Sequence, residues 1–207
     1  MAGDAGRVIA GRAAGRRLAA PGPGTRPLTD RVKQTLFAIL EPDLPGARFL
    51  DLCAGTGAGA IEALSRGAAG ALLVERDARA CRTIAENLER TGLAGPSVRV
   101  VRADAAAWLV TAALAPARTG VREPTDGPFD LVLVDPPYDH PELLETLLAT
   151  LGRETAGRFL RADAGIIAKH FWRAAPPERI GLLRSVRERR FGETTLTFFR
   201  RVATEDE

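Results

Sequence analysis

The chain has 207 residues, of which 45% are hydrophobic, and this length and composition favour one domain with a single sizeable core. No apolar run at the start suits a signal peptide, and none elsewhere approaches the roughly 20 residues that cross a bilayer, so we expect a cytoplasmic protein without membrane contact. Two cysteines and two histidines make neither a disulfide framework nor a zinc-ligand spacing, and we expect no structural metal.

Basic residues gather at the two ends of the chain. Residues 1–34 hold seven Lys and Arg against two Asp, and residues 179–201 hold seven Arg against two Glu. Basic ends around an acidic middle suit a polyanionic partner such as nucleic acid. A merely solvated charged surface is the alternative interpretation.

The first 40 residues predict two small elements. Two short runs around a glycine-rich turn in residues 7–27 indicate a basic β-hairpin, and we expect residues 1–27 to form an extension of a main domain over residues 28–207. Residues 28–40 predict an amphipathic helix capped by Thr29 or Asp30. Its apolar face would consist of Val32, Leu36, Ile39 and Leu40.

From residue 48 the chain alternates short apolar runs with helical patterns. This alternation predicts βαβ units and a parallel sheet, whose strands are apolar throughout because both faces are covered. Strand-like runs occupy residues 48–53, 70–77 and 97–104, and helical patterns occupy residues 61–67 and 81–92. We therefore expect an α/β protein.

The second half continues the pattern after an irregular stretch. Residues 111–128 mix Pro, Gly, Thr and charge without a period, which predicts a surface loop. A strand at 129–134, a helix at 141–152 and a strand at 165–171 follow. Two runs around FGE in residues 182–202 predict an antiparallel hairpin that closes the sheet.

The stretch DLCAGTGAGA, residues 51–60, places glycines at the first turn from strand to helix. Gly55, Gly57 and Gly59 would let the backbone approach a ligand there. A dinucleotide fingerprint in its looser form would tolerate Ala60, so the glycines alone are a weak signal. Asp51 within the strand suits a cofactor that carries an amino group better than one that presents a pyrophosphate there.

Two further acids end the next strands. Glu75, about 20 residues after the glycine turn, suits a carboxylate that accepts both ribose hydroxyls, and Asp104 could accept a hydrogen bond from an adenine amino group. Together with Asp51 they indicate S-adenosylmethionine. For each acid the alternative is a carboxylate that only caps the following helix.

The motif DPPY, residues 135–138, ends the strand FDLVLV. Asp135 and the Pro136 carbonyl could accept the two N–H groups of an exocyclic base amine, and the stiff Pro136–Pro137 unit would hold this geometry. Tyr138 could stack on the base. The alternative is a strand-end turn without chemistry. Neither Cys53 nor Cys81 is placed as a nucleophile with a partner base.

These motifs resemble one family over almost the whole chain. RVIAGRAAGRRL, TRPLTDRVKQTLFAIL, DLCAGTGAGAIEALSRGA, VERD and FDLVLVDPPY are similar to the bacterial RsmD-type small-subunit ribosomal RNA guanine-N2 methyltransferases, which are class I S-adenosylmethionine-dependent enzymes. The resemblance implies a Rossmann-like, seven-stranded, mostly parallel sheet with an antiparallel C-terminal hairpin and a small N-terminal β-hairpin. It also implies that the protein methylates a guanine amine in 16S ribosomal RNA. We expect it to act as a monomer on the small subunit.

The resemblance also implies particular site residues. The catalytic loop would be Asp135, Pro136, Pro137 and Tyr138. The cofactor-binding residues would be Thr29, Arg31, Asp51, Cys53, Ala54, Gly55, Thr56, Gly57, Glu75, Arg76, Asp104 and Ala105.

The basic ends would supply the RNA contacts. Because the extension precedes the helix beside the cofactor, we expect its arginines to flank the catalytic crevice and to contact phosphates. These residues are Arg12, Arg16, Arg17 and Arg26. We expect less from Arg184 to Arg190, since the closing strands should lie towards the edge of the sheet far from the glycine loop.

Two alternatives remain open. DNA adenine methyltransferases share DPPY, and protein glutamine methyltransferases use a related motif, although this chain has no sizeable target-recognition domain for sequence-specific DNA binding. A non-catalytic RNA-binding or assembly factor could also keep the fold, but the complete set of acids argues against it.

Overall fold

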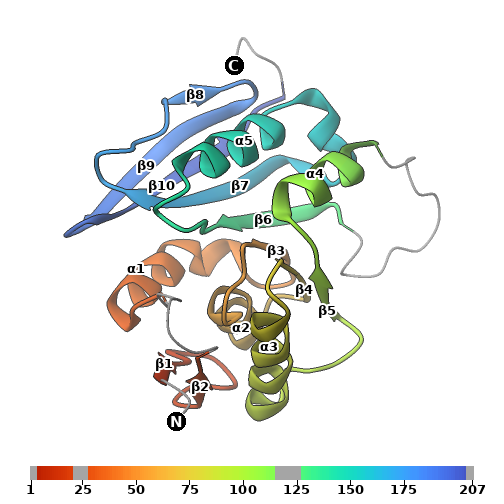
Figure 1. Cartoon of the computed structure of the whole chain (residues 1–207), viewed down its shortest axis with the longest axis vertical. Coiled ribbons are helices and arrows are strands. Elements are labelled where there is room, and N and C mark those ends of the chain that lie inside the picture. Colours follow the sequence, from red (N-terminus) through yellow and green to blue (C-terminus); the bar gives the residue numbers. More distant parts are fainter. Residues whose placement is uncertain (1–3, 21–27, 115–126, 204–207) are drawn as a thin grey trace.

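The computed structural model describes residues 4–20, 28–114 and 127–203. An eight-stranded sheet in the order β5-β4-β3-β6-β7-β10-β9-β8 runs through the molecule, and a separate two-stranded sheet is formed by β1 and β2 (Figure 1). Strands β3 to β7 are mutually parallel, whereas β10, β9 and β8 are antiparallel to their neighbours. This is the expected Rossmann-like α/β architecture.

The elements follow the predicted alternation. The strands are β1 Asp4–Arg7, β2 Arg17–Ala19, β3 Arg48–Leu52, β4 Gly70–Glu75, β5 Val98–Arg102, β6 Phe129–Val134, β7 Leu160–Phe171, β8 Arg179–Ile180, β9 Leu183–Phe191 and β10 Thr194–Arg201. The helices are α1 Asp30–Leu40, α2 Ala58–Ser65, α3 Ala78–Thr91, α4 Ala105–Leu114 and α5 Pro141–Leu151, with short 3₁₀ helices at Glu41–Asp43 and Glu154–Arg158.

Two details of the expected fold are wrong. The main sheet has eight strands rather than seven, because the two-residue strand β8 pairs with the beginning of β9. Residues 111–114 belong to α4 rather than to a loop, since the Ala- and Leu-rich stretch continues the helix to Leu114. The rest of the expected loop, residues 115–126, lies outside the described residues.

The sheet separates two apolar layers. Phe49, Leu131 and Leu133 point to the side covered by α1, α2 and α3, whereas Leu50 and Val132 point to the side covered by α4 and α5. Successive side chains of a strand point to opposite faces, so strands covered on both sides are apolar throughout. The continuous runs in the sequence therefore correspond to the central strands.

Helix α1 begins where the sequence predicts. The Thr29 hydroxyl accepts a hydrogen bond from the Val32 N–H at 3.4 Å, which caps the helix. Of the expected apolar face, Ile39 is only partly buried, and Phe37 is buried in addition. Lys33 is also fully buried on this face, and its ammonium donates to the Arg7 carbonyl. A buried cation therefore joins α1 to the extension.

The N-terminal hairpin is present and packs on α2 and α3. The buried Glu62 carboxylate accepts the Ile9 and Ala10 N–H groups at 2.7 and 3.0 Å. The Asn87 side chain accepts the Ala19 N–H at 2.8 Å and donates to the Ala19 carbonyl at 3.0 Å. The apolar side chains of the hairpin thus belong to the same cluster as α1 and α2. Its expected boundary, at residue 27, falls outside the described residues.

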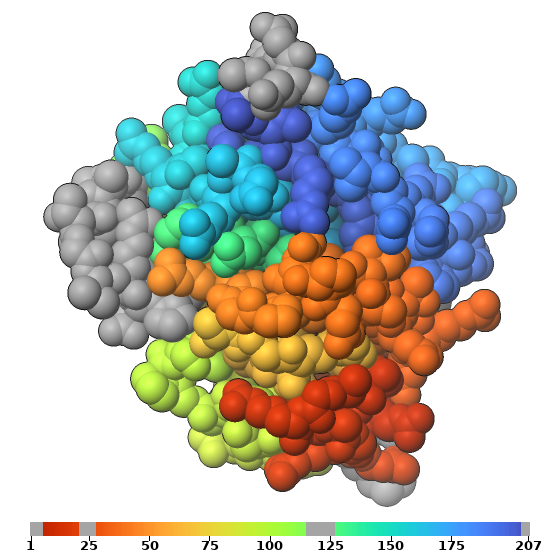
Figure 2. Space-filling view, turned by 180° about the vertical axis from the view of Figure 1, so that it is seen from behind, coloured from red at the N-terminus to blue at the C-terminus, as the bar shows by residue number. Residues whose placement is uncertain are grey.

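The N-terminal extension and the C-terminal strands lie at opposite ends of the molecule. Seen from behind, the red surface of the extension is separated from the blue surface of the C-terminal strands by the orange surface that contains α1 (Figure 2). Figure 1 shows the same separation. Within the described ranges, no helix has the length and apolar character needed to cross a bilayer.

Candidate active site

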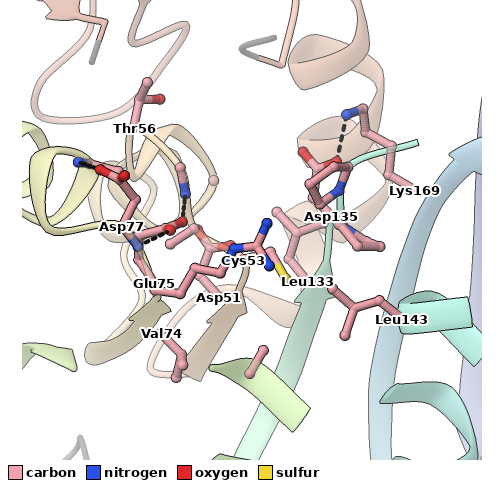
Figure 3. A pocket seen from close by; sticks show the side chains of 18 of the residues that line it. Asp51, Cys53, Thr56, Val74, Glu75, Asp77, Leu133, Asp135, Leu143 and Lys169 are labelled. Atoms are coloured by element: carbon pink, nitrogen blue, oxygen red, sulfur yellow. Dashed lines mark hydrogen bonds and ion pairs between the residues drawn. The ribbon is translucent and has the colours of Figure 1, made fainter. Parts of the chain in front are cut away.

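A cleft of about 590 Å³ opens at the carboxyl ends of the parallel strands. In Figure 3, Glu75 and Asp135 lie on opposite sides of the cleft, with Asp51 between them. Of the expected cofactor and catalytic residues, those that line it are Asp51, Cys53, Ala54, Gly55, Thr56, Glu75, Arg76, Asp104, Ala105, Asp135, Pro136, Pro137 and Tyr138.

Three expected cofactor residues do not line the cleft. Gly57 is the N-cap of α2, and its φ of 75° lies in the left-handed region that glycine adopts without strain. Thr29 caps α1, and Arg31 lies exposed in the first turn of that helix. Their neighbour Leu28, which the sequence did not single out, does line the cleft.

Asp51 is buried at the floor of the cleft. Its Oδ2 accepts the Ala60 N–H of α2 at 2.9 Å. Burial raises the pKa of Asp51 well above its usual range, the Ala60 N–H opposes this shift, and the Asp135 and Glu75 carboxylates add to it. A cationic ligand would stabilise the charged form of such a buried carboxylate, and the amino group of S-adenosylmethionine is such a cation.

Close packing at Gly59 holds this carboxylate in place. A Cβ at Gly59 would lie 2.5 Å from Leu133 Cδ2 and 2.9 Å from Asp51 Oδ2. The sequence suggested that Gly59 gives room to a ligand. In the structure this glycine does line the cleft, and it also lets α2 approach β3 and β6.

Glu75 organises the glycine loop. Its Oε2 accepts the Gly55 N–H and its Oε1 accepts the Asp77 N–H, each at 2.8 Å. Each carboxylate oxygen can accept a second hydrogen bond. The carboxylate could therefore accept two neighbouring ribose hydroxyls while it keeps both of these backbone hydrogen bonds.

Asp104 is placed both to cap the following helix and to contact a ligand, the two roles that the sequence left open. Its Oδ1 accepts the Ala107 N–H at 3.0 Å, which caps the first turn of α4. The same residue lines the cleft, next to Ala105. Capping fixes the side chain and leaves its second oxygen available to a ligand.

Asp135 forms an ion pair that the sequence did not predict. Its Oδ1 accepts a hydrogen bond from the Lys169 ammonium at 2.5 Å, and both side chains are largely buried (Figure 3). Burial raises the pKa of Asp135, and Lys169 opposes this shift. For Lys169, burial lowers the pKa, but Asp135 and Tyr138 more than offset it and the net direction is upward. Lys169 therefore stays protonated beside the acid.

Tyr138 is held from two sides. Its hydroxyl shares a hydrogen bond of 2.7 Å with the Thr194 hydroxyl at the start of β10. The Lys169 Nζ lies 4.8 Å from the centre of its ring, a cation–π contact. The DPPY loop is thus fixed to both β7 and β10.

A second cavity of about 360 Å³ lies on the other side of this loop. It shares Pro136, Pro137, Tyr138 and Lys169 with the cleft, and apolar side chains of α5 form another wall. The loop therefore separates the cleft from this second cavity and lines both.

Neither cysteine is an activated nucleophile. Burial, assisted by Glu75, raises the pKa of Cys53 to about 12, and burial likewise raises the pKa of Cys81. Both are thiols near neutral pH, whereas nucleophilic cysteines need the thiolate. Across the described residues, no three His, Cys, Asp or Glu side chains are grouped so that they could hold a metal ion.

The N-terminal arginines are not brought to the cleft. The backbone N–H of Arg12 donates to the Ser65 carbonyl at 2.8 Å, and the side-chain Nη1 of Arg16 donates to the Arg90 carbonyl at 2.9 Å. Both contacts are at the C-terminal ends of helices, whereas the cleft lies at the helix N-termini. Arg17 is exposed and does not line the cleft, and Arg26 lies outside the described residues.

Lys169 is the main residue that the sequence analysis missed. It lies near the end of the apolar strand GIIAKHF, whose carboxyl end faces the same cleft. An ionisable side chain inside a continuous apolar run that ends at the ligand edge of a sheet was the available signal.

Comparisons with known proteins agree with this geometry. "Putative rRNA methyltransferase YlbH" of Bacillus subtilis (strain 168) is 37% identical over 196 residues, 94% of this chain and 98% of the relative. "Ribosomal RNA small subunit methyltransferase D" of Escherichia coli (strain K12) is 41% identical over 142 residues, 68% of this chain and 64% of the relative.

Solved structures show the same architecture. "Putative methyltransferase yhhF" from Escherichia coli matches with a TM-score of 0.79 and 33% identity, over 98% of this chain and 100% of that one. An RNA methyltransferase from Salinibacter ruber, in complex with S-adenosyl-L-homocysteine, matches with a TM-score of 0.56 and 14% identity over 85% and 94%, which shows a shared fold.

The sheet order, the glycine loop and the carboxylates at the strand ends define a Rossmann-like fold of the class I S-adenosylmethionine-dependent methyltransferases. Within this class, the chain belongs to the family described as Conserved hypothetical protein 95, whose model matches residues 6–200.

Proposed function

We propose that the protein transfers a methyl group from S-adenosylmethionine to the exocyclic N2 of a guanine in 16S ribosomal RNA. The main observation that supports this function is that Asp135, at the end of β6, faces the same cleft as Asp51 and Glu75. The names of the relatives, an rRNA methyltransferase and a small-subunit rRNA methyltransferase, support the substrate class.

The chain's own side chains would hold the cofactor along the strand ends. Asp51 receives the amino group, Glu75 the ribose hydroxyls and Asp104 the adenine amine, while Gly55, Thr56 and Cys53 form the wall between them. Bound there, S-adenosylmethionine supplies an electrophilic methyl group on a sulfonium. The other cofactor residues proposed from the family resemblance are Thr29, Arg31, Ala54, Gly57, Arg76 and Ala105.

Catalysis is proposed to rest on the position of the base amine. The guanine N2 lone pair is delocalised into the ring, so the amine needs acceptors that hold it in the geometry of attack. Lys169 engages Oδ1 of Asp135, which leaves Oδ2 to accept one N–H, and the Pro136 carbonyl accepts the other. Tyr138 stacks on the base, and Oδ2 of Asp135 would take the proton that the nitrogen loses as it accepts the methyl group.

Ribosomal RNA, in the assembled or assembling small subunit, is the proposed partner. Arg12, Arg16, Arg17 and Arg26 are proposed to contact phosphates, which adds affinity without reading sequence. Because Arg16 also donates to the end of α3, Arg12→Ala is the cleaner test of this role. We further propose a cytoplasmic monomer, for which sedimentation of the purified protein tests the oligomeric state.

The deciding experiment is methyl transfer to small subunits from a strain that lacks the gene. Radiolabelled S-adenosylmethionine should label 16S ribosomal RNA at one guanine, which mass mapping of nuclease fragments identifies as N2-methylguanine. Naked RNA, DNA and protein extracts serve as competing substrates. Label on adenine in DNA, on glutamine in protein, or on no substrate at all would reject the proposal.

A further inference from the structure

The turn that joins β9 and β10 lies beside the catalytic loop. Thr194, the first residue of β10, pairs with Phe171 at the end of β7. Its hydroxyl is 2.7 Å from the Tyr138 hydroxyl. The carboxyl end of β7 is at the same edge of the sheet as Asp135, so this turn reaches the active-site edge although its strands lie far across the sheet from β4 and β5 (Figure 1).

A series of aromatic rings connects the catalytic loop with this turn. The ring centres of Tyr138 and Phe171 are 6.4 Å apart, and those of Phe171 and Trp172 are 6.2 Å apart. The backbone N–H of Trp172 donates to the Glu193 carbonyl in the turn at 3.0 Å. Trp172 is therefore fixed two contacts away from the proposed base-stacking residue.

Two arginines lie on the Trp172 ring. The guanidinium carbon of Arg190 is 4.0 Å from the ring centre, and that of Arg173 is 4.7 Å away. Arg190 Nε also donates to the Gly192 carbonyl at 2.9 Å. Both arginine residues are exposed. Exposed guanidinium groups whose direction is already set lose little conformational entropy when they bind a phosphate or stack on a base.

The surrounding surface is basic. Strand β8 pairs with β9 at Leu183 and Arg184, and among the described residues no strand pairs with the outer side of the later part of β9. That part carries the exposed side chains of Arg187, Arg189 and Arg190, with Glu188 between them. Charged residues commonly protect a sheet edge from aggregation, which is the competing explanation.

We propose that Trp172, Arg173 and Arg190, here called the hairpin-tip surface, bind the RNA strand that flanks the methylated guanine. Arginines beside an aromatic ring suit single-stranded RNA, because guanidinium groups pair with phosphates and also stack on unpaired bases. The inference rests on the proposed function and adds a binding surface to it. A nucleotide next to a base held at Tyr138 would lie within reach of this surface.

The proposal changes one expectation from the sequence. We expected less from Arg184 to Arg190 because the closing strands should lie towards the sheet edge far from the glycine loop, and the strand order confirms that position. Along β9, however, the two ends differ: Arg184 is level with Arg200 and with Gly165 in the middle of β7. Arg190 is level with Thr195 and His170, near the carboxyl end of β7. One strand therefore spans from the back of the sheet to the active-site edge.

The test compares two pairs of substitutions that remove equal charge from opposite ends of this region. Arg173→Ala/Arg190→Ala changes the hairpin-tip surface, and Arg179→Ala/Arg184→Ala changes the far end as the matched control. The first pair should weaken subunit binding about tenfold or more and flatten the slope of log affinity against log salt by about two, since each lost phosphate contact removes about one unit. The control pair should change neither quantity.

Separate readouts distinguish the possible outcomes. Trp172→Leu keeps apolar bulk but releases Arg190, and should weaken subunit binding several-fold with S-adenosylmethionine affinity preserved. Unchanged binding and salt slope in the hairpin-tip pair would overturn the inference, and so would equal losses in both pairs. Absence of methyl transfer by the unchanged protein would reject the proposed function. The binding comparison would still show whether the hairpin-tip surface binds RNA. Cofactor titration and thermal melting of every variant verify folding.

Discussion

The Lys169 ammonium lies 2.5 Å from Oδ1 of Asp135, so the acid of the catalytic loop is paired with a buried cation. Burial already raises the pKa of Asp135, and removal of the opposing cation should raise it further. Because the carboxylate form is the acceptor, activity should fall as pH drops through this pKa. Lys169→Met should therefore move the acidic limb of the kcat profile to higher pH.

Lys169→Arg provides the matched control for this prediction. It retains a cation beside Asp135 and should leave the acidic limb close to its original position, even if the altered geometry lowers the rate. An acidic limb that stays in place in Lys169→Met would show that the pair has a structural role only.

Cofactor binding should release protons through Asp51. Its pKa is raised well above the usual range, and a cationic amino group would lower it in the complex, so binding favours the deprotonated form. S-adenosylmethionine affinity should therefore increase as pH rises through the pKa of the free protein. Calorimetry in two buffers of different ionisation enthalpy measures the released protons, and Asp51→Asn should lose both the release and most of the affinity.

Removal of the acceptor should mainly affect turnover. Asp135→Ala is expected to lower turnover at least about a hundredfold, because a positioned group of this kind is worth several kcal/mol in the transition state. The substitution also leaves the Lys169 ammonium buried without its counterion. Asp135→Ala/Lys169→Met removes that second effect, so its melting temperature should recover while its turnover does not. Near-normal turnover in either variant would show that DPPY is only a strand-end turn without a catalytic role.

Stability should depend on the contact between Glu62 and the extension. The buried carboxylate accepts the Ile9 and Ala10 N–H groups as well as Arg66 Nε at 2.8 Å. Glu62→Gln replaces one acceptor by a donor and should lower the free energy of unfolding by about 1–3 kcal/mol. Urea denaturation measures this, with Glu89→Gln on the exposed face of α3 as the control. Equal stability of both variants would contradict the structural role.

The sequence predicted those parts of the site that depend on local pattern. Asp51, Glu75, Asp104 and Asp135 each follow or end an apolar strand, and the carboxyl ends of parallel strands meet at one edge. Strand identity and parallel order were therefore sufficient to bring them together.

The remaining features depend on pairing between distant segments. Lys169 reaches Asp135 because β7 lies next to β6 in a register that no local signal encodes. Arg190 reaches the active-site edge because β10 pairs with β7 and returns β9 to the same end. Arg16 resembled a free cation in the sequence, but its partner, the Arg90 carbonyl, is 74 residues further along the chain.

The buried amide of Asn87 links three segments at one point. Besides its two hydrogen bonds to Ala19, it donates to the Thr56 carbonyl of the glycine loop at 3.0 Å. The hairpin and the glycine loop thus share a single buried group, and neither can open locally without exposing it. A ligand that orders the loop must therefore also slow amide hydrogen exchange at Ala19, even though that residue does not line the cleft.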